Sequence, residues 1–366
     1  MIILAHDWLV GMRGGEWVLD RLARIFGPTQ IYTLVRADTY LSPALEACKI
    51  HTSPLQFFPR ATNAMRRYYL PLMPWAVSKL KVPECSLLFS TSSAVIKSIL
   101  PPKDTPHICY CHSPARYFWD QFENYTKGDG GFLRSIGLRL FRNRFRKWDI
   151  DTCKTVTAFI ANSQFTGDRI KRYYQRDSTV IYPPVRTNFF TPASEIAREN
   201  WFLIVCALEP YKRIEFVVDF ANRKKIPLRI AGTGTQLTRL KRLAGPTIEF
   251  LGQVPDIQLL DLFRRARALI FPQIEDFGIT AVEAQAAGCP VIAFAGGGAL
   301  EIVSQETGEF FSEYSISALE QALNQFSKRS ISANLCAQSA KRFSEARFDF
   351  EISQFVDKHI KANEPR

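Results

Sequence analysis

Residues 268–288 read ALIFPQIEDFGITAVEAQAAG, and the fold class follows from this stretch. The apolar run ALIFP has the length of a buried strand, and it ends at Pro272. The small-residue run GITAVEAQAA that follows is helical in pattern, and Gly288 stops it. A strand that leads through a short loop into a helix predicts one βα unit of a parallel sheet.

The same alternation of apolar runs and helical patterns continues on both sides of this unit. It begins at Met1 and restarts more cleanly after the Pro-rich crossing YPPVRTNFFTP. Two such halves in 366 residues predict an α/β protein with two Rossmann-like, doubly wound parallel-sheet domains facing a central cleft. We expect the first domain at residues 1–190 and the second at 191–345. A C-terminal helix within 346–366 is expected to pack back on the first domain.

The net charge of +12 lies entirely in the first half, where residues 1–190 carry 26 Lys and Arg against 14 Asp and Glu. This asymmetry indicates that the first half meets an anionic surface, either a membrane or a nucleic acid. Eight scattered cysteines without a CxxC pair are typical of a reducing compartment. No signal-peptide pattern and no apolar run of about 20 residues is seen. We therefore expect a cytoplasmic protein that is peripheral on the inner face of the cell membrane.

Two acid-free stretches, 47–83 and 130–148, carry much of this basic excess. In the second, Phe141, Phe145 and Trp148 fall on one helical face with arginines between them, as in a helix lying in a membrane interface. The alternative is a solvated helix whose aromatic side packs on its own domain. Nucleic acid is not expected as a partner, because no recognised nucleic-acid motif accompanies the charge. The candidates for acceptor or membrane contact are Arg116, Arg139, Arg142, Phe145 and Trp148.

The start of the helix after ALIFP is a candidate anion site. Its free backbone amides, near residues 277–280, form the kind of helix N-terminus at which phosphate binds. Glu283 lies about two turns into the helix, where it can accept hydrogen bonds from sugar or ribose hydroxyls. Glu275 lies ahead of the amides and must face sugar hydroxyls or a developing oxocarbenium charge, since a phosphate would repel it. The alternative is that Glu275 and Asp276 merely cap the helix.

Three further loops follow predicted strands. Lys212 and Arg213 stand where a helix begins, the unfavourable end of the helix dipole for cations, and a bound anion would relieve that conflict. The alternative is a pair of solvated surface charges. The GTG loop at Gly232 lets a ligand approach the backbone, and so does the Gly14-Gly15 pair, although a tight turn explains the latter equally well. Neither GxGxxG nor a Walker motif occurs, which argues against a dinucleotide dehydrogenase and a P-loop enzyme.

The stretch HICYCHSPARYFWD, residues 107–120, carries histidine and cysteine at strand spacing. His107, Cys109 and Cys111 would share one face of a strand, but alternate positions on a flat strand gather metal ligands poorly, so a metal site is not expected. His112, at the end of the strand, is the better candidate for the cleft, although a lone histidine is usually structural.

Together these motifs resemble glycosyltransferase family 4, whose members are retaining enzymes of the GT-B fold, and most of all its bacterial mannosyltransferase branch. The resemblance covers nearly the whole chain through HDW...GGE, CHSPARYFWD, IANSQFTGDRI, YPPV, PYKR and the Glu-x7-Glu element. It implies that Glu275 contacts the donor sugar, that His112 lies beside the sugar and that Lys212 holds the leaving diphosphate. Glu283 would bind ribose, and the other implied donor-binding positions are Gly14, Gly15, Arg213, Gly232, Val254, Asp276, Phe277, Gly278, Ile279 and Thr280.

The chain departs from the family pattern at two places. Ala207 stands where many members have an arginine, and Arg186 follows YPPV where an acid is common. No Asp-x-Asp metal motif is present, and the family uses basic residues in place of a metal ion, so neither a metal nor another cofactor is expected.

The resemblance implies transfer of a hexose, namely mannose from GDP-mannose, to a lipid-linked saccharide in cell-surface polysaccharide or lipopolysaccharide synthesis. The alternatives are a UDP-sugar-dependent transferase of the same fold, a nucleotide-sugar epimerase or phosphorylase, and a non-catalytic nucleic-acid-binding protein.

Overall fold

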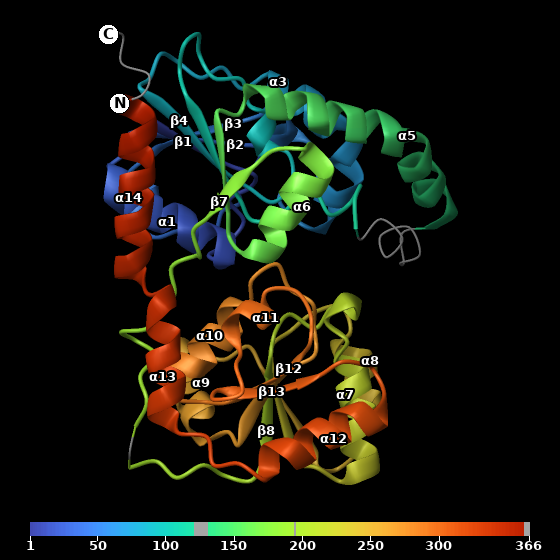
Figure 1. Cartoon of the computed structure of the whole chain (residues 1–366). Helices are drawn as coiled ribbons and strands as arrows, with labels where there is room; N and C mark the ends of the chain where they lie inside the picture. Colours follow the sequence, from blue (N-terminus) through green and yellow to red (C-terminus); the bar gives the residue numbers. More distant parts are fainter. Residues whose placement is uncertain (121–130, 194, 362–366) are drawn as a thin grey trace. The chain divides into compact units, whose positions relative to one another are not determined.

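The structure is a computed structural model that describes residues 1–120, 131–193 and 195–361, with the side chains of 64, 65, 67 and 131–140 excepted. The chain divides into two compact units (Figure 1). The first unit joins Met1–Pro184 to Phe348–Arg366, and the second is Val185–Arg347.

The first unit is built on a seven-stranded parallel sheet in the order β3-β2-β1-β4-β5-β6-β7. The order reverses direction between β1 and β4, which makes that position the switch point of the sheet. The strands are β1 (Ile2–His6), β2 (Gln30–Thr33), β3 (Lys49–Thr52), β4 (Leu87–Ser92), β5 (His107–Cys111), β6 (Ala158–Ala161) and β7 (Ser178–Val180). The helices are α1 (Gly14–Phe26), α2 (Pro43–Glu46), η1 (Pro54–Phe57), η2 (Ala64–Leu72), α3 (Met73–Ser78), η3 (Ile96–Ser98), α5 (Gly131–Thr152), η4 (Cys153–Thr155) and α6 (Gln164–Tyr174).

The last helix, α14 (Glu345–Lys361), belongs with the first unit from Phe348 onward. Phe348, Ile352 and Val356 enter the same hydrophobic core as the buried leucines of α1. The Arg21 guanidinium of α1 forms an ion pair with Asp349 of α14, and the two helices run beside one another in Figure 1. The C-terminal helix thus covers one face of the first sheet.

The second unit has a six-stranded parallel sheet in the order β10-β9-β8-β11-β12-β13, with its switch point between β8 and β11. Its strands are β8 (Phe202–Val205), β9 (Leu228–Ala231), β10 (Ile248–Gly252), β11 (Ala268–Phe271), β12 (Val291–Phe294) and β13 (Gly308–Phe311). Its helices are η5 (Pro210–Lys212), α7 (Ile214–Lys224), α8 (Leu237–Leu243), α9 (Asp256–Arg265), α10 (Ile279–Ala286), α11 (Ala299–Ile302), α12 (Ile316–Ser327), α13 (Ala333–Ala340) and η6 (Lys341–Phe343). The strand and helix expected at 268–288 are β11 and α10.

The chain enters the second unit at Val185, earlier than the boundary expected after residue 190. The backbone N–H of Val185 donates to the carbonyl of Phe343 at 2.9 Å, and Val185 forms a parallel bridge with Ser344. The first residues after YPP are therefore tied to the last residues of the same unit.

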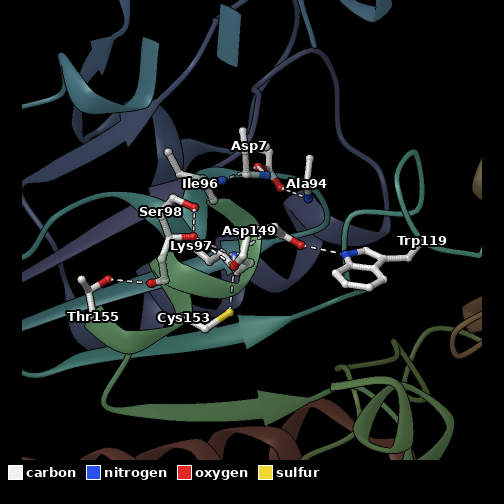
Figure 2. A network of polar contacts seen from close by, with 11 residues as sticks. Asp7, Ala94, Ile96, Lys97, Ser98, Trp119, Asp149, Cys153 and Thr155 are labelled. Carbon is white, nitrogen blue, oxygen red and sulfur yellow. Dashed lines mark hydrogen bonds and ion pairs between the residues drawn. The ribbon is translucent and has the colours of Figure 1, made fainter. Parts of the chain in front are cut away.

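Buried charges hold the first unit together at its switch point, as Figure 2 shows. The Asp7 carboxylate, just after β1, accepts hydrogen bonds of 2.6–2.9 Å from four consecutive backbone N–H groups, those of residues 93–96. Next to them, the Lys97 ammonium lies 2.8 Å from the Asp149 carboxylate of α5, and Trp119 donates to the same carboxylate at 2.8 Å. Every charge in this network has a partner, as burial requires.

The aromatic face expected to meet a membrane on α5 instead covers the sheet. Phe145 is 5% exposed and stacks on Phe118 with ring centroids 4.2 Å apart, and Trp148 packs against the same core. The prediction of membrane contact was wrong for Phe145 and Trp148, because the first sheet needs an apolar cover and this stripe supplies it. Phe141 stays exposed and Arg142 is half-buried, whereas the side chain of Arg139 lies outside those described. Among the described helices none is long and apolar enough to cross a bilayer.

Candidate active site

An ion pair marks the switch point of the second sheet. Lys212 follows β8, Glu275 follows β11, and the Lys212 ammonium contacts the Glu275 carboxylate. The two side chains are 13% and 16% exposed, so both are largely shielded yet within reach of a ligand. Burial acts to lower the pKa of Lys212, but the charge of Glu275, its hydrogen bond to Lys212 and the neighbouring Tyr211 and Cys206 together raise the pKa. Lys212 is therefore a cation at neutral pH.

The amides expected to bind phosphate belong to the start of α10. The residue that precedes the helix is Gly278, with φ of +115°, a conformation that only glycine adopts readily. Gly278 has no side chain to cap the first turn, which begins at the half-buried Ile279 and Thr280. Phe277 is buried against Phe343 with ring centroids 5.3 Å apart, and Asp276 is buried too. Glu275 lies beside Lys212, just ahead of the N-terminus of α10.

Glu283 lies inside α10 with its side chain 13% exposed. Burial raises the pKa of this carboxyl to about 7, Arg186 acts to lower it, and Asp256 acts to raise it. A carboxylate with this pKa changes charge in the neutral range, and in its charged form it accepts hydrogen bonds from hydroxyl groups.

Two neighbouring loops complete the edge of this sheet. Arg213, at φ of +59°, sits between η5 and α7, and its guanidinium lies 5.3 Å from the centroid of the Tyr314 ring. A Cβ on Gly232 would lie 1.9 Å from the carbonyl oxygen of Cys206, so the two loops meet only because this residue is glycine. Thr235 Oγ1 donates to the Glu209 carboxylate at 2.8 Å and links the same loops. The half-buried Val254 follows β10.

In the first unit, the candidate residues gather at the ends of β1 and β5. Gly14 and Gly15 form the first turn of α1, not a loop as expected. A Cβ on Gly15 would lie 3.3 Å from Cε1 of His6 and 3.6 Å from Nε2 of His112. Burial, then the neighbouring His6 and Arg116, lower the pKa of His112 to about 3. The His112 imidazole is therefore neutral at physiological pH, and its Nε2 has no hydrogen-bond partner among the described residues.

The weaker candidates of the first unit have structural contacts of their own. Arg116 Nε donates to Ser113 Oγ at 3.2 Å. His107 is fully buried and its Nε2 shares a 2.7 Å hydrogen bond with Ser90 Oγ. Over the part of the chain that the structure describes, no three His, Cys, Asp or Glu side chains are grouped so that they could hold a metal ion.

Several site residues were missed from the sequence. His6 is the last residue of β1 and Asp7 follows it, as His112 follows β5, and comparing the ends of neighbouring strands would have found them. In the sequence Arg186 is only a departure from the family pattern, yet its Nη2 lies 3.8 Å from Glu283 Oε1. No local sequence signal reveals this contact, because the two residues are far apart in the chain.

Comparison with known protein families assigns both halves. Residues 12–189 match the model described as "Glycosyltransferase Family 4", and residues 186–343 match "Glycosyl transferases group 1". Together these models cover nearly all of both units.

Individual relatives are similar to this chain at low sequence identity and over about half of its length. The O-antigen chain mannosyltransferase C of Escherichia coli is 27% identical over 54% of this chain and 57% of its own length. A GDP-mannose-dependent phosphatidylinositol monomannoside mannosyltransferase of Corynebacterium glutamicum is 29% identical over 56% of this chain and 61% of its own. A D-inositol 3-phosphate glycosyltransferase of Streptomyces avermitilis is 26% identical, over 51% and 47%. The chain thus spans only about half the length of these curated relatives.

Solved structures share the fold over the full length. Anabaena Alr3699/HepE, in complex with UDP and glucose, has a TM-score of 0.67 at 16% identity, and the match covers 97% of this chain and 99% of that one. Sucrose-phosphate synthase from Thermosynechococcus elongatus has a TM-score of 0.73 at 16% identity, with 99% and 100% covered. With two parallel sheets whose switch points carry the family motifs, the chain belongs to glycosyltransferase family 4 and has the GT-B fold.

Proposed function

We propose that the protein is a retaining hexosyltransferase that moves mannose from GDP-mannose to a lipid-linked saccharide in cell-surface polysaccharide or lipopolysaccharide synthesis. The observation that carries this proposal is the Lys212–Glu275 pair beside the start of α10. It places one cation, one carboxylate and a helix N-terminus where doubly wound sheets bind their ligands. The mannosyltransferase relatives favour mannose as the sugar.

Donor binding would exchange the partner of Lys212. The diphosphate attracts the ammonium and the amides of α10, so Lys212 leaves Glu275 for the phosphate. The released Glu275 carboxylate then faces the sugar, where it stabilises positive charge that develops at the reacting carbon. Glu283 accepts hydrogen bonds from the ribose hydroxyls at the other side of the nucleotide.

The proposed reaction is a same-face substitution. The bond from the anomeric carbon to the phosphate oxygen breaks, and a bond to the acceptor hydroxyl oxygen forms on the same face of the sugar. The departing phosphate takes the proton of that hydroxyl, so no covalent enzyme intermediate and no metal ion are needed. In the first unit, neutral His112 is suited to a hydrogen bond with a sugar hydroxyl and not to binding phosphate.

A UDP-sugar is the second candidate donor. It is favoured by the likeness to Anabaena HepE, whose solved complexes contain UDP, glucose or UDP-glucose. The family models favour a transferase over the epimerase, the phosphorylase and the nucleic-acid-binding protein considered above.

The first unit is the proposed site of acceptor binding and of membrane contact. With Phe145 buried and Trp148 packed against the same core, the exposed aromatic side chains of the acid-free stretch 47–83 are the better membrane contacts. Phe57 is 87% exposed and Trp75 is 42% exposed, among Lys and Arg side chains and with no acid between them. Such a surface suits anionic lipid headgroups. We propose that it holds the protein at the cytoplasmic face of the membrane, where lipid-linked saccharides are assembled.

The test is a calorimetric titration of the protein with GDP-mannose, UDP-glucose and UDP-N-acetylglucosamine, with and without EDTA. We expect GDP-mannose to bind most tightly, with an affinity that EDTA does not change. Tighter binding of a UDP-sugar would overturn the mannose assignment and leave the family intact. Loss of binding in EDTA would contradict the metal-free mechanism. Binding of none of the three would refute the proposed donor site.

A further inference from the structure

Arg186 connects the entrance of the second unit to the donor-binding helix. Its Nη1 lies 2.6 Å from Asp256 Oδ2 at the start of α9, and its Nη2 lies 3.8 Å from Glu283 Oε1 in α10. One guanidinium thus spans two carboxylates from two helices, with its side chain 27% exposed.

The Arg186 backbone is fixed independently of these contacts. The preceding residue, Val185, is hydrogen-bonded to Phe343 and forms a β-bridge with Ser344. The Arg186 guanidinium also lies 5.3 Å from the centroids of the Phe189 and Phe190 rings. Of the two carboxylates beside the Arg186 guanidinium, that of Asp256 is closer and, at 51%, more exposed to solvent. Asp256 therefore fixes the guanidinium, and the second N–H pair is directed to Glu283.

Arg186 is the cation that acts on the Glu283 carboxyl. The charged groups that act on this carboxyl are Arg186 and Asp256, the first favouring and the second opposing its charged form. Helix α9 also packs on α10 and carries Asp261, Arg264 and Arg265, of which Arg265 pairs with Asp261 and Arg264 donates to Thr191. Of the other elements with several contacts to α10, α11 carries Glu301, α13 carries the thiol of Cys336, and β11 and β12 carry no charged side chain. Glu345 also acts on Arg186, as a third negative neighbour of the guanidinium. Arg186 is thus the counter-charge for a largely buried carboxylate, which is costly to ionise without one.

We propose that Arg186 is a positioning residue, which keeps the Glu283 carboxylate charged and oriented to accept hydrogen bonds from the ribose hydroxyls of the donor. The inference rests on the proposed function, since it takes Glu283 to be the ribose ligand. Binding of the nucleotide should then depend on pH through Arg186.

The experiment is calorimetric titration of GDP, with UDP in parallel, into the wild type and Arg186→Gln at about pH 6, 7, 8 and 9. Arg186→Gln should bind the diphosphate about tenfold more weakly near neutral pH, and most of the loss should disappear at the highest pH, where Glu283 ionises unaided. Arg186→Lys should restore binding. In a Glu283→Gln background, Arg186→Gln should add no further loss, since no charge is left to support.

The matched control is Arg223→Gln, which removes an exposed guanidinium of α7 with a carboxylate partner at 2.9 Å, and it should change nothing. The 2′,3′-dideoxy diphosphate lacks the ribose hydroxyls, so wild type and Arg186→Gln should bind it equally. Equal GDP affinity of wild type and Arg186→Gln at every pH would overturn the inference, as would an equal loss for the dideoxy analogue. If the wild type binds neither GDP nor UDP, the proposed function fails and the inference about Arg186 fails with it. That outcome is distinguishable from the two above, in which the wild type binds GDP.

Discussion

In each unit a lysine–carboxylate pair lies next to the switch point of the sheet, and the two pairs differ in how far they are exposed. Lys97 and Asp149, in the first unit, are 1% and 2% exposed, and further partners surround them (Figure 2). Lys212 and Glu275, in the second, are 13% and 16% exposed. We expect the pair that is closed by other partners to stabilise the fold, and the pair at the proposed donor site to exchange its partner for a substrate.

The largest expected effect is the loss of stability when the closed pair is broken. Lys97→Met leaves Asp149 charged and buried, and this should lower the free energy of unfolding by about 3–5 kcal/mol. Urea denaturation followed by circular dichroism measures it. Adding Asp149→Asn removes the orphaned charge but keeps an acceptor for Trp119, so the double variant should regain much of the loss. A loss below about 1 kcal/mol in Lys97→Met would contradict the structural role of the pair.

Glu275→Gln should affect activity instead of stability. Without its carboxylate the sugar loses charge stabilisation, so kcat/KM for transfer should fall about 10²–10³-fold. Lys212 no longer has to leave an ion pair, so the bare nucleoside diphosphate should bind as tightly as to the wild type or more tightly. Transfer assays and calorimetry with GDP separate the two effects. Weaker diphosphate binding in Glu275→Gln would argue against partner exchange.

Glu283 should make donor affinity depend on pH. Burial raises the pKa of its carboxyl to about 7, and the charged form accepts stronger hydrogen bonds from the ribose hydroxyls than the protonated form does. The Glu283 carboxyl protonates as the pH falls through about 7. Donor affinity should therefore drop by up to about tenfold per pH unit below that value and level off above it. Glu283→Gln should flatten this profile, and a profile that stays unchanged would assign the pH dependence to another group.

The smallest expected effect belongs to an exposed pair. Arg223 and Asp219 lie one turn apart on α7, with side chains 64% and 48% exposed. Arg223→Gln should change the free energy of unfolding by less than about 0.5 kcal/mol and should leave transfer unaffected. A larger change in either quantity would mean that exposure is a poor guide to the role of a charge pair in this protein.

The fold was predictable from the sequence because parallel strands are apolar throughout and their helices follow at once. The strand at residues 268–271 and the helix at 279–286 were read correctly. Lys212 and Glu275 lie on one sheet edge since each belongs to a βα connection, and Glu283 lies in the helix that follows Glu275. Contacts that cross the fold were not predictable. The packing of Phe145 and the contact of Arg186 with Glu283 depend on which elements become neighbours. Periodicity shows that a helix has an aromatic face, but not what covers it.

The most direct test of the account is calorimetric titration of GDP into Lys212→Ala beside the wild type, with the thermal unfolding midpoint of each measured in the same buffer. The account predicts at least about a hundredfold weaker binding, because the diphosphate loses its charged partner, together with an unchanged midpoint. Equal affinity in the two proteins would show that Lys212 and Glu275 are a structural pair after all, and that the diphosphate binds elsewhere.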